Sequence, residues 1–368
     1  MNPIVSQLSQ EESYLKFTLS GVNVSVANAL RRIMLAEIPT VVFRTTPHDK
    51  NLAVFEKNTS RLNNELIKQR LSCIPIHITD VDFQFQNYLL EVNKKNESDI
   101  IEYVTTADFK IKDINTDTYL TDAVMKQLFP PDKITGDYID FVRLRPRISA
   151  DIEGEQLKMS CKFDIGWAAQ DSAFNVVATC AYANTPDPVK IRDAWALKEA
   201  ELKKTGMTAD DLEFTKKDWH FIDAKRLFVE DSFDFIIESV GPFPEMSIIS
   251  KSIDIMLTKL KKFKDTIQSE PDVVVMSDST IPNCYDITLK NEGYTLGKVI
   301  EYILYSKYYG KAVTYCGFRK PHPHIDISTI RIAFKEQTDR INTISYLSSS
   351  ADDAIACYQK LFKVFNNL

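Results

Sequence analysis

A strand-like run followed closely by an amphipathic helix occurs twice in this sequence, and this repeat most restricts the possible fold. In the first copy, the run 14–19 precedes a polar link with Gly21 and an apolar stripe that begins at Val26. In the second copy, the run 285–289 precedes a polar link and a stripe that begins at Leu296. Apolar residues at three- and four-residue steps share one helix face. The spacing therefore predicts two similar strand–helix units.

The ends of both helices carry capping signals. Asn23 or Ser25 can cap the start of the first helix, and Pro39 disfavours helical geometry at the residue before it. Thr295 can cap the start of the second helix, and Gly310 can end it. Both helices are therefore bounded by residues that favour helix ends.

Each strand–helix pair is followed later in the chain by a second helix with a narrow apolar stripe. Its spacing is 3-4-3-4-3 from Met246 to Phe263 and 4-3-4-3 from Ala351 to Phe365. Such stripes suit helices that pack at shallow angles. We interpret the aspartate pair 352–353 as lying at a helix start, where it favours the helix dipole. The pattern suggests an intramolecular pseudo-dimer, although any α+β protein contains runs of this kind.

A long β-rich stretch, roughly 43–224, separates the two helices of the first unit and is interpreted as an inserted domain. The charged segment 194–218 predicts a solvated helix or an excursion of the chain. Strands are expected within this stretch at 74–78, 141–144, 157–163 and 175–182.

Composition excludes several classes of protein. The 368 residues include 45 basic and 51 acidic side chains, a net charge of −6, which argues against a general nucleic-acid binder. No apolar run approaches the ~18–20 residues of a membrane helix, and no signal peptide is visible. The six cysteines are scattered, which indicates buried thiols in a reducing compartment. We therefore expect a soluble intracellular protein.

Several motifs resemble those of a known family. The stretch 26–40, VANALRRIMLAEIPT, closely resembles a helix of alpha-like RNA polymerase subunits, which in that family helps to form the dimer interface. The segments 55–75, 104–109 and 234–241 are similar to three further family motifs in the same order, and 166–175 matches a fourth loosely. The resemblance covers nearly the whole chain except roughly 183–225.

The second half of the chain resembles the smaller partner subunit of that family. Residues 291–300 are similar to its EDHTLGNLL motif, with Tyr294 in place of His and Lys298 in place of Asn. Residues 316–324 and 330–332 are similar to its CGYxxPHP and IRI segments. The chain thus resembles a fusion of the third and eleventh subunits of eukaryotic RNA polymerase II, counterparts of archaeal subunits D and L and of the bacterial alpha dimer. The fusion itself resembles the arrangement in large DNA viruses.

The resemblance implies an α+β fold in which two alpha-like dimerisation units form a pseudo-dimer within the chain rather than a homodimer. Helices would pack on small antiparallel sheets, and a β-rich domain would be inserted. We expect the first unit at 1–45 and 225–268, the inserted domain at 46–224 and the second unit at 269–368. The expected pseudo-dimer interface comprises Leu30, Ile33, Met34, Met256, Leu260, Leu296, Val299, Ile300, Ile303, Tyr358 and Phe362.

The resemblance also implies a non-catalytic assembly platform for the two largest polymerase subunits, with small zinc-binding subunits alongside. The adjacent Arg31 and Arg32 suit either phosphates or acidic protein groups, and the acidic chain favours the latter. Catalytic magnesium and structural zinc are expected in partner subunits, and no cofactor is expected here. Cellular forms would be nuclear, and viral forms would occur in host cytoplasm and virions. The residues expected to dock the large subunits are Asn28, Arg31, Arg32, Glu37 and Arg70.

Metal binding and catalysis have little support in the sequence. Many relatives carry a cysteine cluster where this chain has none, roughly 80–102, so we predict no metal. Cys316, His322 and His324 lack a fourth zinc ligand, and the prolines around the histidines indicate a turn. No catalytic constellation or phosphate-binding loop is present, which argues against an independent enzyme.

Two other functions remain open. The alternating Arg143, Arg145 and Arg147 suit a protein-contact patch, a solvated strand edge or a minor nucleic-acid contact, and the first two are favoured. A DNA-contacting transcription subunit is therefore one alternative, although little or no direct DNA contact is expected. An alpha-like fold with an unrelated protein-interaction role is the other.

Overall fold

A computed structural model describes the chain except residues 12–13, 81–83, 150–151 and 368. The described residues form two compact units. Unit 1 comprises Met1–Met34, Thr179–Glu238 and Ile249–Leu368, and unit 2 comprises Leu35–Ala178 and Ser239–Ile248. No helix within the described ranges is both long and apolar enough to cross a lipid bilayer.

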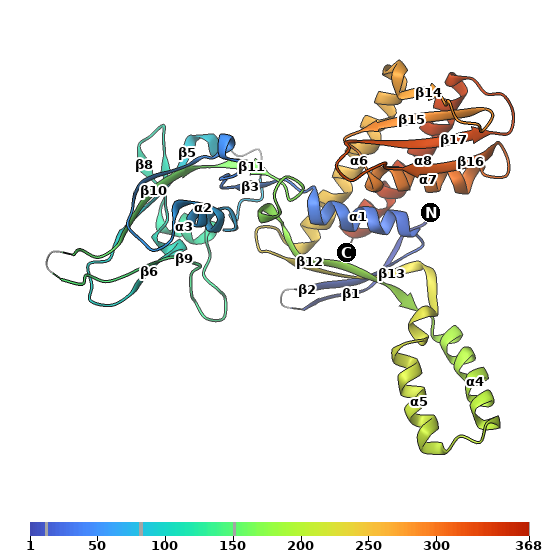
Figure 1. The fold of residues 1–368 in the computed structure, drawn as a ribbon, viewed down its shortest axis with the longest axis horizontal. Helices are drawn as coiled ribbons and strands as arrows, with labels where there is room; N and C mark the ends of the chain where they lie inside the picture. The colour runs from blue at the N-terminus through green and yellow to red at the C-terminus, as the bar shows by residue number, and fades with distance from the viewer. Residues whose placement is uncertain (12–13, 81–83, 150–151, 368) are drawn as a thin grey trace. The chain divides into compact units, whose positions relative to one another are not determined.

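Unit 1 contains two four-stranded sheets, one for each copy of the strand–helix repeat predicted from the sequence (Figure 1). We call each sheet with its helices one half of unit 1. In the first sheet the spatial order is β1 (Ile4–Glu11), β2 (Tyr14–Ser20), β13 (Phe228–Ser239) and β12 (Val177–Pro186). In the second sheet the order is β14 (Val274–Met276), β15 (Cys284–Lys290), β17 (Ile327–Phe334) and β16 (Val313–Arg319).

The helices follow the same repeat. β2 leads into α1 (Val24–Ala36) and β13 into α6 (Glu245–Ser269), just as β15 leads into α7 (Tyr294–Tyr308) and β17 into α8 (Arg340–Asn366). β2 pairs antiparallel with β13, and β15 pairs antiparallel with β17. This shared order confirms the predicted α+β fold with two similar units.

The two halves differ in their connections. Most of unit 2 lies between α1 and β12, whereas α7 is joined to β16 by only a few residues. Between β12 and β13 lies a helical hairpin of α4 (Pro188–Lys204) and α5 (Ala209–Phe221), whereas residues 320–326 suffice between β16 and β17. The charged segment 194–218 therefore lies in this hairpin and is helical except for the turn at 205–208 (Figure 1).

Unit 2 is built on a five-stranded sheet around an aromatic core. Phe109 contacts the ring edges of Phe129 and Phe141, each at a centroid distance of 5.4 Å, and all three are at most 3% exposed. The sheet order is β4 (Ala53–Asn58), β10 (Gln156–Lys162), β5 (Tyr88–Lys95), β7 (Lys110–Asp113) and β8 (Thr118–Tyr119). The other elements are the paired strands β3 (Thr40–Val42) and β11 (Asp164–Gly166), the paired strands β6 (Glu102–Thr105) and β9 (Asp140–Leu144), and helices α2 (Asn64–Ser72) and α3 (Asp122–Leu128).

Short 3₁₀ turns complete the secondary structure. They lie at His48–Lys50, Phe85–Asn87, Thr106–Asp108, Ser172–Phe174, Ala224–Arg226 and Pro271–Val273.

Three of the four strands expected between 43 and 224 are present as β9, β10 and β12, and the strand expected at 74–78 is wrong. Ile74 and Ile76 do reach the core of unit 2, at 6% and 1% exposure. They do so from an irregular segment, because Pro75 has no N–H to donate to a neighbouring strand.

The boundaries of the compact units differ from the expected domain boundaries in three places, one of which is that Ser239–Ile248 groups with unit 2. β12 is a strand of the first sheet, so residues from Thr179 to the end of the α4–α5 hairpin group with unit 1 rather than with the inserted stretch. Unit 2 begins at Leu35, inside the last turn of α1.

Of the predicted helix-end residues, Asn23 and Gly310 are confirmed and Thr295 is wrong. Asn23 caps α1: its Oδ1 accepts a hydrogen bond from the Ser25 N–H at 2.9 Å. The predicted cap at Thr295 is wrong, because α7 begins at Tyr294 after Gly293 and Thr295 lies inside the helix. Gly310 has a φ of +75° just beyond the end of α7, as expected of a residue that terminates a helix.

The placement of the aspartate pair 352–353 at a helix start is also wrong. α8 begins at Arg340, where Asp339 Oδ1 accepts a hydrogen bond from the Asn342 N–H at 2.7 Å. The first turns of α8 bury Thr343 and Ser350 rather than a continuous aliphatic stripe, so the apolar pattern becomes visible only later in the helix.

A cross-strand ion pair in the second sheet predicts a dependence of stability on pH. Asp286 on β15 lies opposite Arg331 on β17, and the guanidinium donates to both carboxylate oxygens at 2.6 and 2.7 Å. These hydrogen bonds lower the pKa of Asp286 below its ordinary value of 3.8. The ion pair therefore stabilises the folded protein fully at a pH above the ordinary pKa of aspartate. This stabilisation is lost as the pH falls through the lowered pKa of Asp286.

We expect Asp286→Asn to remove part of the acid-induced loss of stability. The measurement is the urea midpoint of the variant and of the native protein between pH 7 and pH 2.5. Asp278→Asn, a change at an exposed aspartate of the same half, serves as the control. Parallel stability–pH curves for Asp286→Asn and the native protein would contradict this role of the pair.

Candidate assembly interface

Each half of unit 1 contributes its long helix to the other half. Lys259 on α6 donates to both carboxylate oxygens of Glu292, which lies between β15 and α7, at 3.0 and 2.9 Å. In the opposite direction, the ring of Phe365 on α8 meets Phe17 on β2 edge-on at 5.2 Å. Lys360 Nζ on α8 also donates to Asn2 Oδ1 at 2.8 Å. The two halves therefore exchange helices reciprocally.

The aspartates of α8 connect this exchange to the neighbouring helices. Asp352 pairs with Lys264 on α6, and Asp353 pairs with Lys307 on α7, each at 2.6 Å. The lysines are 27% and 36% exposed, so each pair contributes modestly on its own. Together they fix α8 between α6 and α7.

The residues predicted for the pseudo-dimer interface are almost all buried. Phe362 alone among them is only partly buried. The other ten are at most 4% exposed: Leu30, Ile33, Met34, Met256, Leu260, Leu296, Val299, Ile300, Ile303 and Tyr358. The pseudo-dimer prediction requires this burial, and the assignment of each side chain to the interface stays a prediction.

The adjacent arginines of α1 have different surroundings. Arg31 is partly buried, and its Nε donates to Asn28 Oδ1 at 3.0 Å. Burial raises the pKa of the Cys180 thiol to about 12, a shift that the nearby Arg31 charge opposes. Arg32 is exposed, and its Nε donates to Thr295 Oγ1 on α7 at 3.0 Å. Arg32 therefore links the two halves while presenting its charge to solvent.

Beside this link, α1 and α7 line a groove of about 430 Å³. Among its lining residues, only Asn28 was predicted to be a docking residue. The sequence did contain a sign of the groove: Tyr294 and Lys298, which replace the His and Asn of the family motif, both line it. The remaining lining residues are Asn23, Val24, Ser25, Glu301, Tyr302 and Tyr305.

Gly297 allows α7 to approach the second sheet closely. A Cβ added at this position would lie 2.1 Å from the ring of Phe318 on β16. Helix propensity favours alanine over glycine by ~1 kcal/mol, but overpacking a fitted contact costs more. We expect Gly297→Ala to lower the free energy of unfolding by about 1–3 kcal/mol in urea titrations.

Gly293→Ala is the matched control, because a Cβ there would meet only Lys320 Nζ, at 3.9 Å. A stabilising effect of Gly297→Ala would contradict the close approach of α7 to Phe318.

The remaining predicted docking residues, Glu37 and Arg70, belong to unit 2. Arg70 on α2 donates from Nε to Phe141 O at 2.7 Å and from Nη2 to Asp140 O at 2.6 Å. This guanidinium holds α2 against β9, which is a structural role. Glu37 follows α1 and is partly buried. Asn28, Arg31 and Arg32 belong to unit 1, and docking through any of the five stays a prediction.

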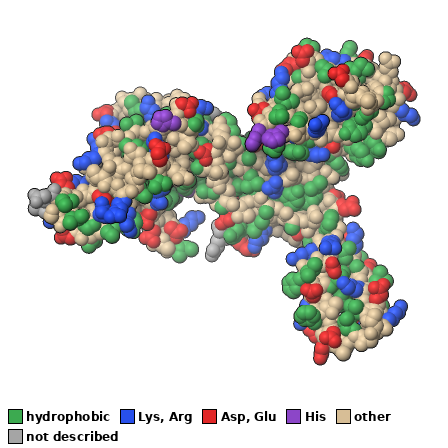
Figure 2. All heavy atoms as spheres, viewed as in Figure 1, with side chains coloured by type: hydrophobic (Ala, Val, Ile, Leu, Met, Phe, Trp, Pro, Cys, Tyr) green, Lys and Arg blue, Asp and Glu red, His purple; other side chains and the backbone are tan. Residues whose placement is uncertain are grey.

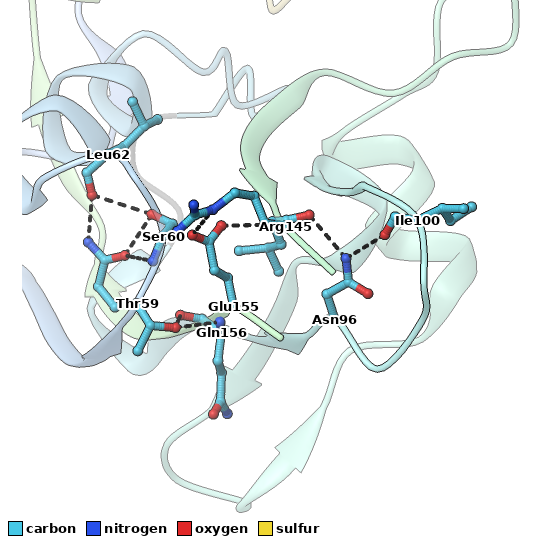
Figure 3. A network of polar contacts seen from close by, with 10 residues as sticks. Thr59, Ser60, Leu62, Asn96, Ile100, Arg145, Glu155 and Gln156 are labelled. Carbon is cyan, nitrogen blue, oxygen red and sulfur yellow. Dashed lines mark hydrogen bonds and ion pairs between the residues drawn. The ribbon is translucent and has the colours of Figure 1, made fainter. Parts of the chain in front are cut away.

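Two of the three alternating arginines of unit 2 have acidic partners: Arg147 lies 3.8 Å from Asp99, and Arg145 pairs with Glu155. Arg145 Nε pairs with Glu155 Oε1 at 2.6 Å, and the Arg145 N–H donates to the other oxygen at 2.7 Å (Figure 3). Glu155 is 6% exposed, and the fully buried Asn96 ties the neighbouring loop to Ile100 O at 2.8 Å (Figure 3). Arg143 is exposed on β9. Arg145 therefore neutralises a buried carboxylate instead of facing a ligand.

The histidine turn shows no metal-binding arrangement. The His324 N–H donates to His322 Nδ1 at 3.1 Å, so this ring nitrogen serves the turn. Burial raises the pKa of Cys316 to about 12, which favours the thiol over the metal-binding thiolate. Among the residues that the structure describes, no three His, Cys, Asp or Glu side chains could hold a metal ion together. The absence of metal from the chain stays a prediction.

Comparison with known proteins decides the family. A family model described as the RNA polymerase Rpb3/Rpb11 dimerisation domain matches residues 16–260, and a second model with that description matches residues 284–363. The chain belongs to the Rpb3/Rpb11 family. The two matched ranges include most of both sheets, without the edge strands β1 and β14, all of α1 and α7 and most of α6 and α8, and the first range also spans unit 2.

Curated relatives of this Rpb3/Rpb11 chain are named as polymerase subunits. The human "DNA-directed RNA polymerases I and III subunit RPAC1" is 26% identical over 307 residues, which cover 72% of this chain and 84% of the relative. The Pyrococcus furiosus "DNA-directed RNA polymerase subunit Rpo3" is 25% identical, covering 72% and 97%. The Arabidopsis thaliana "DNA-directed RNA polymerases IV and V subunit 3B" is 24% identical, covering 76% and 92%.

Proposed function

We propose that this protein is a non-catalytic assembly platform of a DNA-directed RNA polymerase, on which the two largest subunits dock. The observation that carries the proposal is the reciprocal exchange of α6 and α8 between two Rpb3/Rpb11 dimerisation domains of one chain. A pseudo-dimer of this kind presents two related but unequal surfaces, which suits two different large partners.

The proposal includes small zinc-binding subunits as further partners and gives DNA little direct contact with this chain. Small zinc-binding polymerase subunits dock alongside, and catalytic magnesium and structural zinc belong to partner subunits rather than to this chain. Direct DNA contact contributes little, since Arg145 is paired with a buried carboxylate and the net charge is −6. This observation favours the platform over a DNA-contacting subunit.

The proposed location follows from the polymerase role. A eukaryotic cellular polymerase of this kind acts in the nucleus. The presence of both dimerisation domains in one chain supports the proposal of a viral subunit, which acts in host cytoplasm and is carried in the virion.

Arg32 provides the most direct test of docking on unit 1. We expect Arg32→Ala to weaken binding of the two largest subunits roughly tenfold or more, because the exposed guanidinium pairs with acidic partner groups. The measurement is the dissociation constant for large subunits purified from the native source. Thr295→Val, which removes only the hydrogen bond to Arg32, should have a smaller effect.

Lys261→Ala is the charge-matched control, because Lys261 is an exposed cation on α6. Equal effects of Arg32→Ala and Lys261→Ala would show that only the overall charge matters and would contradict docking at α1.

A further inference from the structure

The α4–α5 hairpin bears an acidic, aromatic stripe on one side of α5. We define the α5 face as Asp210, Phe214, Asp218 and Phe221, which recur at steps of four, four and three and so share one side of the helix. We propose that this face docks a protein whose apolar cleft is rimmed by lysine and arginine. The proposal is independent of the platform and of docking at α1.

The opposite side of α5 packs against α4 within the hairpin. Trp219 packs on Trp195 of α4 at a ring distance of 5.3 Å, and each is 6% exposed. Lys216 lies over the Trp195 ring at 5.9 Å, and Leu212 packs against the same cluster. Residues 212, 216 and 219 therefore define the inner side, and the α5 face lies on the outer side.

The hairpin holds the α5 face in a fixed arrangement. Asp187 caps α4 by accepting hydrogen bonds from the N–H groups of Val189 and Lys190, each at 3.0 Å. Thr208 caps α5 by accepting from the Asp211 N–H at 3.3 Å. The outer side chains thus sit on preformed helices, which lowers the conformational entropy lost on binding.

The two phenylalanines have no evident role in folding. Phe214 is 75% exposed and Phe221 is 71% exposed, two turns apart on the same side. Figure 2 shows hydrophobic and acidic side chains next to one another on the surface of the hairpin. The second half of unit 1 closes the equivalent connection with residues 320–326 alone, so its sheet does not require a hairpin. Aromatic side chains exposed in this way are typical of binding sites.

The charges of the α5 face select the kind of partner. Asp210 and Asp218 flank the phenylalanines, and neither forms an ion pair with any residue that the structure describes. Lys217 lies on the same side of α5, between Phe214 and Phe221, and is paired with Glu213 at 2.8 Å, so the face keeps the net negative charge of Asp210 and Asp218. Such a face repels nucleic acid and anionic lipid, and a second copy would place carboxylates against carboxylates. A partner with an apolar cleft and a basic rim complements the face, because the cleft accommodates the phenylalanines and the rim pairs with the aspartates.

Site-specific crosslinking tests whether the α5 face has this partner. The full-length protein carries the photoreactive amino acid p-benzoylphenylalanine in place of Phe214, and crosslinking is done in extracts of the native source and in the purified complex. We expect one crosslinked protein, with the crosslinked peptide in an apolar cleft bordered by Lys and Arg. The same substitution at Leu197, which is 72% exposed on α4, is the control and should give no such product.

Binding of the purified crosslinked partner then tests the two parts of the face separately. We expect Phe214→Ala with Phe221→Ala to weaken binding at least ~30-fold, and Asp210→Lys with Asp218→Lys to do so by a similar factor. Leu197→Ala should leave the affinity unchanged. The charge variant keeps both phenylalanines, so it tests the proposal even if the aromatic variant fails to fold. Crosslinks confined to this chain or to a second copy, equal crosslinking from position 197, or unchanged affinity of the charge variant would overturn the proposal.

Discussion

Replacing Tyr358 with alanine is expected to lower the free energy of unfolding of unit 1 by about 3–5 kcal/mol. Tyr358 lies on α8, is fully buried and is the largest of the fully buried side chains among the described residues. Its removal leaves a cavity in the region where α8 joins the two halves. The measurement is urea denaturation followed by far-ultraviolet circular dichroism.

The matched variant Tyr358→Phe separates packing from hydrogen bonding. The Tyr358 hydroxyl forms no hydrogen bond with the described residues, and burial raises its pKa well above the ordinary value. An unsatisfied buried hydroxyl carries a desolvation cost, so we expect Tyr358→Phe to raise the stability by about 1 kcal/mol. A loss of more than about 1 kcal/mol in Tyr358→Phe would show that the hydroxyl has a partner and would contradict this account.

Breaking the chain between Ser269 and Pro271 is expected to give two segments that fold only together. Without its partner, each segment lacks the long helix that packs against its sheet, as the contacts Lys259–Glu292 and Phe17–Phe365 show. The break must follow Ser269 because α6 continues to that residue. We expect 1–269 and 271–368 to purify as a 1:1 complex when coexpressed, and each alone to be unfolded or aggregated.

The measurement is size-exclusion chromatography with light scattering, together with circular dichroism of each segment. In the intact chain, the covalent link gives the two halves an effective concentration toward the millimolar range. The break removes this link, so association of the two segments then depends on their concentration. Two separately folded segments that do not associate would refute the pseudo-dimer. An uncut chain that carries a protease site after Ser269 is the control.

Local periodicity explains why the repeat was visible in the sequence. The buried positions of α1 include Val26, Leu30 and Ile33, whose aliphatic side chains make a clear stripe. The first half of α8 buries Thr343 and Ser350 instead, so the helix is longer than its apolar pattern. Hydroxyl-bearing residues that bond to their own helix backbone, as Ser350 does to Tyr346 O at 2.9 Å, give no hydrophobic signal.

Contacts between distant residues explain what sequence reasoning missed. The groove beside Arg32 is assembled from α1 and α7, which are far apart in the chain, and no local pattern reports their proximity. The role of Arg70 depends on the backbone carbonyls of Asp140 and Phe141, and carbonyl positions leave no trace in side-chain identity. Likewise, the charges of 194–218 predicted solvation but not the pairing of Trp195 with Trp219.

The most direct test of the platform is purification of the intact protein from its native source at moderate salt, followed by mass spectrometry of the bound proteins. The account predicts two very large subunits in equal amounts and RNA synthesis in the eluate. Recovery of the folded chain without large partners would contradict the assembly role and leave only a shared fold.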